Sequence, residues 1–286
     1  MNIDIICPLY NAEKDIEGLH KSLLKQKNVQ INEIRYVLTE SKDKTEEKLK
    51  ELNIEYKKIK KEEFSHSLTR EKEAFESNAD ILVFITQDVK IVRDDWLYNL
   101  TKDIIDGQVE ACYSRQLCDN NTIEKYTREC NYPAESKIVS KDDIEKLGLK
   151  TFFFSDASSA IKRETFVKLN GYDNKRLIIN EDMYITYKLI MNGYKIKYCA
   201  DSEVIHSHTF TLKQYYNRYK DTGKFFKENS YLNKYKVNQA GGSMAKYVLK
   251  RAIQDKNWNV LVKFIPNMAA RFIGMKLGEK GCKNDR

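Results

Sequence analysis

The chain has 286 residues, of which 41% are hydrophobic and 32% are charged, and a formal net charge of +8; this composition is ordinary for a soluble globular protein. No apolar run approaches the roughly 20 residues that a membrane-spanning helix needs, and the first residues lack a signal-peptide pattern. The six cysteines form no C-x-x-C pair, which argues against a zinc site or a disulfide framework and favours a cytoplasmic protein with reduced thiols.

Strand and helix patterns alternate over the first 114 residues. Short apolar runs predict strands at 3–7, 34–38, 54–59, 81–85 and 109–114. Between them, helices are expected at 16–24, 43–52, 68–77 and from 94 or 95 to 105. This order predicts an α/β fold with a doubly wound, mainly parallel central sheet.

The rest of the chain changes character twice. Residues 115–150 are polar, contain Pro133 and show no strong period, which indicates a long loop-rich stretch with a functional role. A helix and three short strands then follow, the helix at 182–192 with Gly193 as its end, and the strands at 152–154, 195–199 and 204–206. Beyond about Thr211 the pattern becomes helical and basic.

The last part of the chain carries most of the net charge. Residues 240–286 contain ten Lys or Arg and three Asp or Glu. Between 246 and 278 these charges alternate with apolar residues, a pattern typical of a basic helix lying on an anionic membrane. A helix packed on the rest of the chain, with its charged face in water, is the alternative. No motif points to nucleic acid, and none is expected as a partner.

Candidate metal ligands follow two of the expected strands. The apolar run 81–85 leads to Asp88, and ligands in such sheets bind outside the carboxyl ends of the strands. A carboxylate there suits Mg²⁺ or Mn²⁺ when a diphosphate completes the shell, although a solvated turn aspartate has the same pattern. His206 and His208 share one face of a strand and could join a carboxylate on manganese, or simply lie at the surface.

Further polar clusters are expected at the same edge of the sheet. The loops after the first two strands are where a base and ribose dock, and Asp43 fits either that role or helix capping. Arg70 could reach a diphosphate or lie in solvent. Asn180 is a good N-cap residue, and capping alone could explain the acids Glu181 and Asp182.

Taken together, these clusters resemble family 2 glycosyltransferases of the GT-A fold, and more narrowly bacterial rhamnosyltransferases that build surface polysaccharides. The resemblance runs from residue 3 to about 227 and depends on ordered blocks such as CPLYNAEKDI, FSHSLTRE, ILVFITQDV, FFFSDASSAIKRETF, NEDMYITYKLIMNGYKIKYCADSEVIHSH and QYYNRYKDTG. Thr-Gln-Asp in place of Asp-x-Asp, with His-Ser-x-x-Arg upstream, is the rhamnosyltransferase variant.

The resemblance implies a role for each matching residue. Asp88 would bind a divalent metal, Mn²⁺ or Mg²⁺, with His206 or His208 completing the site, and Asp182 would be the general base. The nucleotide sugar would contact Pro8, Tyr10, Asn11, Thr39, Glu40, Asp43, Arg70 and Gln87. The sugar and acceptor would face Arg115, Gln116, Asp156, Ser158 and Glu181.

The resemblance also implies an organisation and an activity. A GT-A catalytic domain is expected at 1–210, divided into a nucleotide-binding half (1–114) and an acceptor-binding half (115–210), followed by a basic helical region at 211–286. The expected reaction is the inverting, metal-dependent transfer of L-rhamnose from dTDP-L-rhamnose to a growing, lipid-linked surface glycan at the inner face of the cell membrane.

Two departures from the family pattern keep alternatives open. Leu38 and Thr39 stand where family 2 usually has an Asp pair, so Glu40 would have to recognise the base, and Thr86 replaces the first acid of Asp-x-Asp. A UDP-hexose or UDP-N-acetylhexosamine donor is therefore the first alternative. The second is an inactive scaffold that binds nucleotide sugars, which the intact acids and histidines disfavour.

Overall fold

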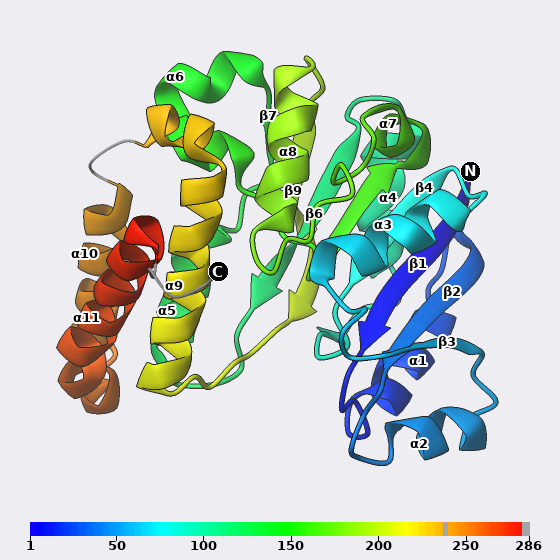
Figure 1. Cartoon of the computed structure of the whole chain (residues 1–286), viewed down its shortest axis with the longest axis horizontal. Coiled ribbons are helices and arrows are strands. Elements are labelled where there is room, and N and C mark those ends of the chain that lie inside the picture. Colours follow the sequence, from blue (N-terminus) through cyan, green and yellow to red (C-terminus); the bar gives the residue numbers. More distant parts are fainter. Residues whose placement is uncertain (237–239, 282–286) are drawn as a thin grey trace.

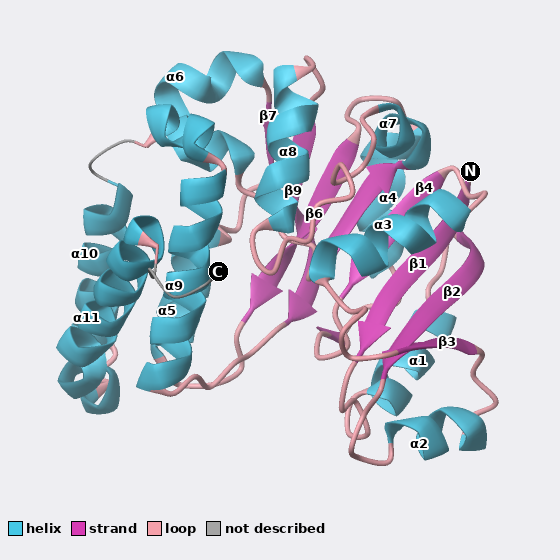
Figure 2. Ribbon diagram, viewed as in Figure 1, coloured by secondary structure: helices cyan, strands magenta, loops and turns pink. Residues whose placement is uncertain are grey.

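A computed structural model describes residues 1–236 and 240–281 of the chain. Within these residues, nine strands form one sheet in the order β3-β2-β1-β4-β8-β6-β9-β5, with β7 paired to β9 (Figure 2). The strands are β1 (Asn2–Leu9), β2 (Gln30–Thr39), β3 (Tyr56–Ile59), β4 (Ile81–Ile85), β5 (Lys90–Ile91), β6 (Ala111–Leu117), β7 (Lys137–Val139), β8 (Ser158–Lys162) and β9 (Ile196–Ile205).

The sheet is parallel through its first four strands and mixed beyond them. β3, β2, β1 and β4 run parallel, as do β6 and β9, whereas β8 runs antiparallel to both β4 and β6. The expected α/β class with a central sheet is confirmed. The strand expected at 152–154 is wrong: Phe152 ends a 3₁₀ turn (Gly148–Phe152), and the strand begins at Ser158. A short apolar run alone does not distinguish a strand from another buried segment.

Helices cover both faces of the sheet because its strands alternate two sets of apolar side chains. Along β1, Ile3, Ile5 and Cys7 point into a core shared with α1, α2 and α4, whereas Ile6 points into a second core shared with α3, α7 and α8. The helices of the first core are α1 (Ile16–Leu24), α2 (Thr45–Glu51) and α4 (Trp96–Ile105). Those of the second core are α3 (His66–Glu76), α7 (Arg163–Lys168) and α8 (Glu181–Met191).

Most of residues 115–150 form regular elements, so the expectation of a loop-rich stretch is wrong. They contain α5 (Ile123–Asn131), β7, a 3₁₀ turn (Lys141–Asp143) and α6 (Ile144–Leu147). The hydroxyl of Thr122 caps α5 by accepting a hydrogen bond from the Glu124 backbone N–H over 3.2 Å. Such short elements carry too few periodic residues to be recognised from sequence alone.

The C-terminal region is helical, as expected. It contains α9 (Leu212–Glu228), a 3₁₀ turn (Ser230–Tyr235), α10 (Ala240–Gln254) and α11 (Trp258–Lys280), which lie with α5 in a layer beside the sheet (Figure 1). In the described part of the chain, no helix combines the length and apolar character needed to cross a bilayer.

Helices α9 and α11 cross with almost no space between their backbones. Three glycines line the crossing, namely Gly223 on α9 and Gly274 and Gly278 on α11. A Cβ atom on Gly278 would lie 2.0 Å from the backbone oxygen of Lys220, and one on Gly223 would lie 2.3 Å from that of Met275. The absence of side chains at these positions therefore permits the contact.

Candidate active site

A cavity of about 840 Å³ opens at the carboxyl ends of the central strands. Its sheet side comes from Tyr10 after β1, Asp88 after β4 and His206 after β9, and from Asp182 at the start of α8. Its opposite side comes from α5, α9 and α11. The cavity therefore lies between the sheet and the C-terminal helices.

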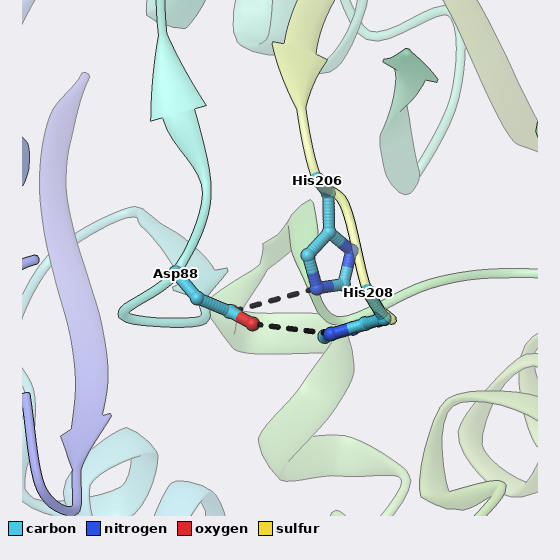
Figure 3. Close-up of side chains that lie close together, drawn as sticks. All are labelled: Asp88, His206 and His208. Atoms are coloured by element: carbon cyan, nitrogen blue, oxygen red, sulfur yellow. Dashed lines mark ion pairs between the residues drawn. The ribbon is translucent and has the colours of Figure 1, made fainter. Parts of the chain in front are cut away.

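Asp88, His206 and His208 come together at this cavity. Asp88 Oδ1 lies 3.4 Å from His206 Nε2, and Asp88 Oδ2 lies 3.6 Å from His208 Nδ1 (Figure 3). One ligand atom from each residue lies within 4.8 Å of the others. The short antiparallel pair β5–β9, in which Lys90 is opposite Ile205, brings the two chain segments side by side.

The charge states of this group fit a divalent metal. Burial disfavours the charged form of Asp88, but His206 and His208, in their protonated forms, hold its pKa well below the usual range. Burial lowers the pKa of His206, and burial together with His206 lowers that of His208 to about 4. The group thus offers one carboxylate and two neutral imidazoles, the forms that bind metal.

Gln116 orients the His206 ring through a contact with its Nδ1 atom. Its Oε1 lies 2.8 Å from His206 Nδ1 and also accepts a hydrogen bond from Arg128, while its Nε2 donates to Ser155 Oγ over 2.7 Å. With its proton on Nδ1, the imidazole turns the lone pair of Nε2 towards Asp88. Gln116 is buried and does not line the cavity, so the sequence prediction that it faces the sugar does not match its position.

Three carboxyl groups and one guanidinium form the second cluster of the cavity. Arg70 Nη1 donates to Glu181 Oε1 over 2.8 Å, and Arg70 Nη2 donates to the backbone oxygen of Asp156 over 3.3 Å. The Asp156 carboxylate accepts from Tyr172 Oη over 2.8 Å. Asp182 is adjacent to Glu181 in the first turn of α8 and lines the cavity.

Burial and mutual repulsion govern the protonation of these acids. Burial, followed by the charges of Glu181 and Asp156, raises the pKa of Asp182 well above its usual value. Burial also raises the pKa of Glu181 and of Asp156, although Arg70 opposes both shifts. Asp182 is therefore a stronger proton acceptor than a solvated aspartate.

Asn180 does not cap α8 as the sequence indicated. Its backbone is left-handed, with φ of 60°, and its side chain makes no capping hydrogen bond. Its buried Nδ2 has no hydrogen-bond partner among the described residues. Capping by Asn180 therefore does not explain the acids that follow, and Arg70 is the group that holds Glu181.

The structure brings some of the predicted nucleotide-binding residues to the cavity and leaves others away from it. The residues that line the cavity are Pro8, Tyr10, Arg70 and Gln87. Gln87 Oε1 accepts from the Tyr10 backbone N–H over 2.7 Å, and Gln87 Nε2 donates to the Tyr10 backbone oxygen over 2.9 Å. Arg70 is fully buried and balances Glu181. The residues that do not line the cavity are Asn11, Thr39, Glu40 and Asp43.

Asn11 and Asp43 instead join the loops that follow β1 and β2. Asn11 Oδ1 accepts from the Lys42 backbone N–H over 2.9 Å. Asp43 accepts from the Glu13 backbone N–H over 3.1 Å and from the Thr45 backbone N–H over 3.2 Å. These contacts show that Asp43 has a structural role at the start of α2.

Two predicted sugar- or acceptor-facing residues lie away from the cavity. Arg115 forms an ion pair with Glu203 over 2.8 Å. Ser158 is buried, and its Oγ accepts from Trp96 Nε1 over 3.2 Å and lies 2.6 Å from Ser114 Oγ. Asp156 and Glu181, by contrast, line the cavity.

The C-terminal helices and α5 contribute cavity residues that the sequence reasoning did not single out. Arg128 on α5, Arg218 on α9 and Arg271 on α11 all line the cavity. Arg218 lies 5.2 Å from the ring centroid of Phe210, and Arg271 lies 4.4 Å from that of Tyr215. The QYYNRYKDTG block, which contains Arg218, was the one available signal for this wall.

Comparison with known proteins gives consistent results. A family model described as Glycosyl transferase family 2 matches residues 4–169. The chain is 33% identical to the O-antigen chain rhamnosyltransferase RfbN of Salmonella typhimurium, over 98% of this chain and 90% of RfbN. It is 36% identical to the O-antigen chain rhamnosyltransferase WbaN of Salmonella anatum, over 77% of this chain and 71% of WbaN.

Solved structures confirm the GT-A fold. The mannosyltransferase PcManGT from Pyrobaculum calidifontis, in complex with GDP-Man and Mn²⁺, has a TM-score of 0.61 at 15% identity, over 95% of this chain and 83% of that one. Residues 1–349 of S. aureus TarS give a TM-score of 0.56 at 14% identity, over 98% and 90% of the two chains.

Proposed function

Because the chain belongs to glycosyl transferase family 2 and is a glycosyltransferase, we propose that it transfers L-rhamnose from dTDP-L-rhamnose to a growing bacterial surface polysaccharide with inversion at the anomeric carbon. The observation that carries this proposal is that Asp182 and the Asp88–His206–His208 group line one cavity. The similarity of the chain to two O-antigen rhamnosyltransferases supports the choice of L-rhamnose as the sugar.

Asp182 is proposed to take the proton of the acceptor hydroxyl. Asp182 lines the cavity, and burial together with two neighbouring acids raises its pKa. A raised pKa brings the carboxylate closer to the pKa that general base catalysis needs near neutral pH. A single displacement of this kind, with the hydroxyl attacking opposite the leaving group, inverts the anomeric configuration.

Asp88, His206 and His208 are proposed to hold a divalent cation. One carboxylate and two imidazoles suit Mn²⁺ better than Mg²⁺, which prefers oxygen ligands. When bound, such an ion stabilises the negative charge of the departing nucleoside diphosphate. Arg128 and Arg218 add positive charge to the wall of the same cavity.

A donor screen tests the proposal. The protein is mixed with dTDP-L-rhamnose, UDP-hexoses or UDP-N-acetylhexosamines, each with Mn²⁺ or with a chelator, and nucleotide release is measured. We expect release from dTDP-L-rhamnose that depends on metal. Release from a UDP-sugar alone would overturn the donor assignment, and release from none of the donors would favour a binding scaffold.

The Asp182→Asn variant tests the base assignment. We expect it to abolish transfer and to leave donor binding close to that of the wild type, because the amide keeps the size of the side chain. The matched control is Asp142→Asn, since Asp142 is exposed and lies outside the cavity. Loss of donor binding in Asp182→Asn would show that the residue acts in binding rather than as the base.

A further inference from the structure

Helix α11 has two faces with different surroundings. Val260, Asn267, Arg271, Gly274 and Gly278 are buried and face the rest of the protein. The other face is apolar and open: Trp258, Val262, Ile265, Phe272, Ile273 and Leu277 are between 41% and 76% exposed. These six residues, together with the exposed Pro266 and Ala269, define the outward stripe of α11.

The outward stripe is continuous along the helix. Its members recur every three or four residues, which places them on one side of an α-helix. At 1.5 Å per residue, the stripe extends over about 30 Å. Isolated exposed apolar side chains are common in folded proteins, but a stripe of this length marks an interaction surface.

The charges around the stripe are almost all positive. Lys263, Lys276 and Lys280 are exposed on α11, and the single acid of the helix, Glu279, pairs with Lys236 and Lys276. The neighbouring helix α10 exposes Lys246 and Lys250 together with the apolar Leu249 and Ile253.

We propose that the outward stripe of α11 lies in the headgroup region of an anionic lipid membrane. The apolar residues enter the boundary of the acyl chains, and the lysines contact lipid phosphates. The helix lies along the surface, since no described helix has the character of a membrane span. Trp258, at the start of the helix, has the amphipathic ring that is enriched at membrane interfaces.

Charge favours lipid over a second copy of the chain. Two copies joined through their outward stripes would gather Lys263, Lys276 and Lys280 of both helices around one interface. This arrangement places like charges together at the rim of an apolar contact, where repulsion opposes association. Anionic headgroups instead neutralise each lysine near the surface.

The position of α11 gives the contact a functional consequence. Arg271, on the face opposite the stripe, lines the active-site cavity. One helix, about 10 Å in diameter, thus separates the cavity from the proposed membrane surface. If the proposed function holds, this position would keep a lipid-linked acceptor near the cavity that Asp182 also lines.

The two tryptophans of the chain provide a direct test of membrane contact. Trp96 is fully buried and Trp258 is 71% exposed, so a blue shift of the fluorescence on adding vesicles reports Trp258. We expect the full chain to bind vesicles of phosphatidylcholine with phosphatidylglycerol, with this blue shift, and to bind pure phosphatidylcholine at least about tenfold more weakly. Trp258→Phe should remove the shift.

Variants distinguish binding through the outward stripe from non-specific binding to vesicles. The double variant Val262→Asp/Ile265→Asp should lower vesicle affinity at least about tenfold, because two apolar contacts with the acyl chains are replaced by charges. Val92→Asp is the matched control: Val92 is 56% exposed and lies on the loop before α4, so its substitution should leave binding unchanged. Circular dichroism checks that each variant is folded.

The outcomes are independent of the proposed activity, because the assay contains neither donor nor acceptor. Failure of the wild-type chain to bind anionic vesicles, or equal binding by the double variant, would overturn the proposal. So would a dimer, detected by light scattering, that the double variant abolishes without any vesicle binding by the wild type.

Discussion

Arg70 Nη1 and Glu181 Oε1 lie 2.8 Å apart and are both buried, so an ion pair joins α3 to the first turn of α8. The two residues are 111 positions apart in the chain. This pair fixes the backbone next to Asp182, and the Arg70 charge opposes the rise in the pKa of Asp156, Glu181 and Asp182. Both the stability of the cavity wall and the protonation of Asp182 therefore depend on Arg70.

Replacing Arg70 with Met should destabilise the protein strongly. The substitution leaves Glu181 and Asp156 buried without their cation, and breaking a buried pair typically costs about 3–5 kcal/mol. Urea unfolding at neutral pH measures this loss. Arg70→Met/Glu181→Gln should recover part of it, whereas Arg93→Met, which removes an exposed pair with Asp95, should cost about 0–1 kcal/mol. Equal losses for the two arginines would contradict this account.

The pH dependence of transfer should carry the signature of Asp182. Because only the carboxylate accepts a proton, and because its pKa is raised, kcat/KM should rise with pH through a pKa above that of an ordinary aspartate. Glu181→Gln removes a negative neighbour and therefore lowers the pKa of Asp182. The rise of kcat/KM at low pH, the acid limb of the profile, should then move to lower pH by about one unit or more.

The control for the pH experiment is Glu203→Gln. Glu203 pairs with Arg115 and does not line the cavity, so its substitution should leave the acid limb in place. An acid limb that does not move in Glu181→Gln would show that another group controls the rate.

Gln116→Leu should weaken metal binding. Without the Gln116 oxygen, the Nδ1 proton of His206 loses its acceptor at 2.8 Å, and loss of such an orienting partner typically lowers metal affinity about 10- to 100-fold. Titration of the protein with Mn²⁺, followed by calorimetry, measures the change. Gln108→Leu, at an exposed position on the loop before β6, should bind Mn²⁺ as the wild type does, and unchanged affinity in Gln116→Leu would exclude the orienting role.

Two glycine substitutions should have opposite effects on stability. Gly278→Ala places a methyl group against the Lys220 backbone oxygen, so the helices must separate at a cost of about 1–3 kcal/mol. Gly18→Ala lies within α1, where a Cβ meets no atom within 4 Å, and should stabilise the protein by about 0.5–1 kcal/mol. Thermal unfolding of both variants tests the prediction, and a stable Gly278→Ala would show that the crossing tolerates a side chain.

The sequence alone predicted the central sheet and the group around Asp88 well. Asp88, His206 and His208 follow strands whose apolar patterns are clear, and strand ends at one edge of a sheet lie close together. Their proximity therefore follows from topology. The role of Gln116 does not, because it depends on a side-chain contact with His206 across 90 positions of the chain.

The wall opposite the sheet could not be predicted in the same way. Arg128 lies on a nine-residue helix in a segment without a clear period, and Arg271 reaches the cavity because α11 packs on α9. Such contacts are set by tertiary packing, and sequence periodicity carries no information about tertiary packing. The antiparallel β8 was missed for a related reason, since its small residues lack an apolar signature.

The glycine crossing of α9 and α11 also constrains how proteins of this kind diverge. Substitutions at Gly223, Gly274 or Gly278 would change the distance between the helices and with it the position of Arg271 at the cavity. Residues on the outward side of α11, such as Val262 and Ile265, touch neither the crossing nor the cavity. The outer surface of this helix can therefore change in evolution without disturbing the wall of the cavity.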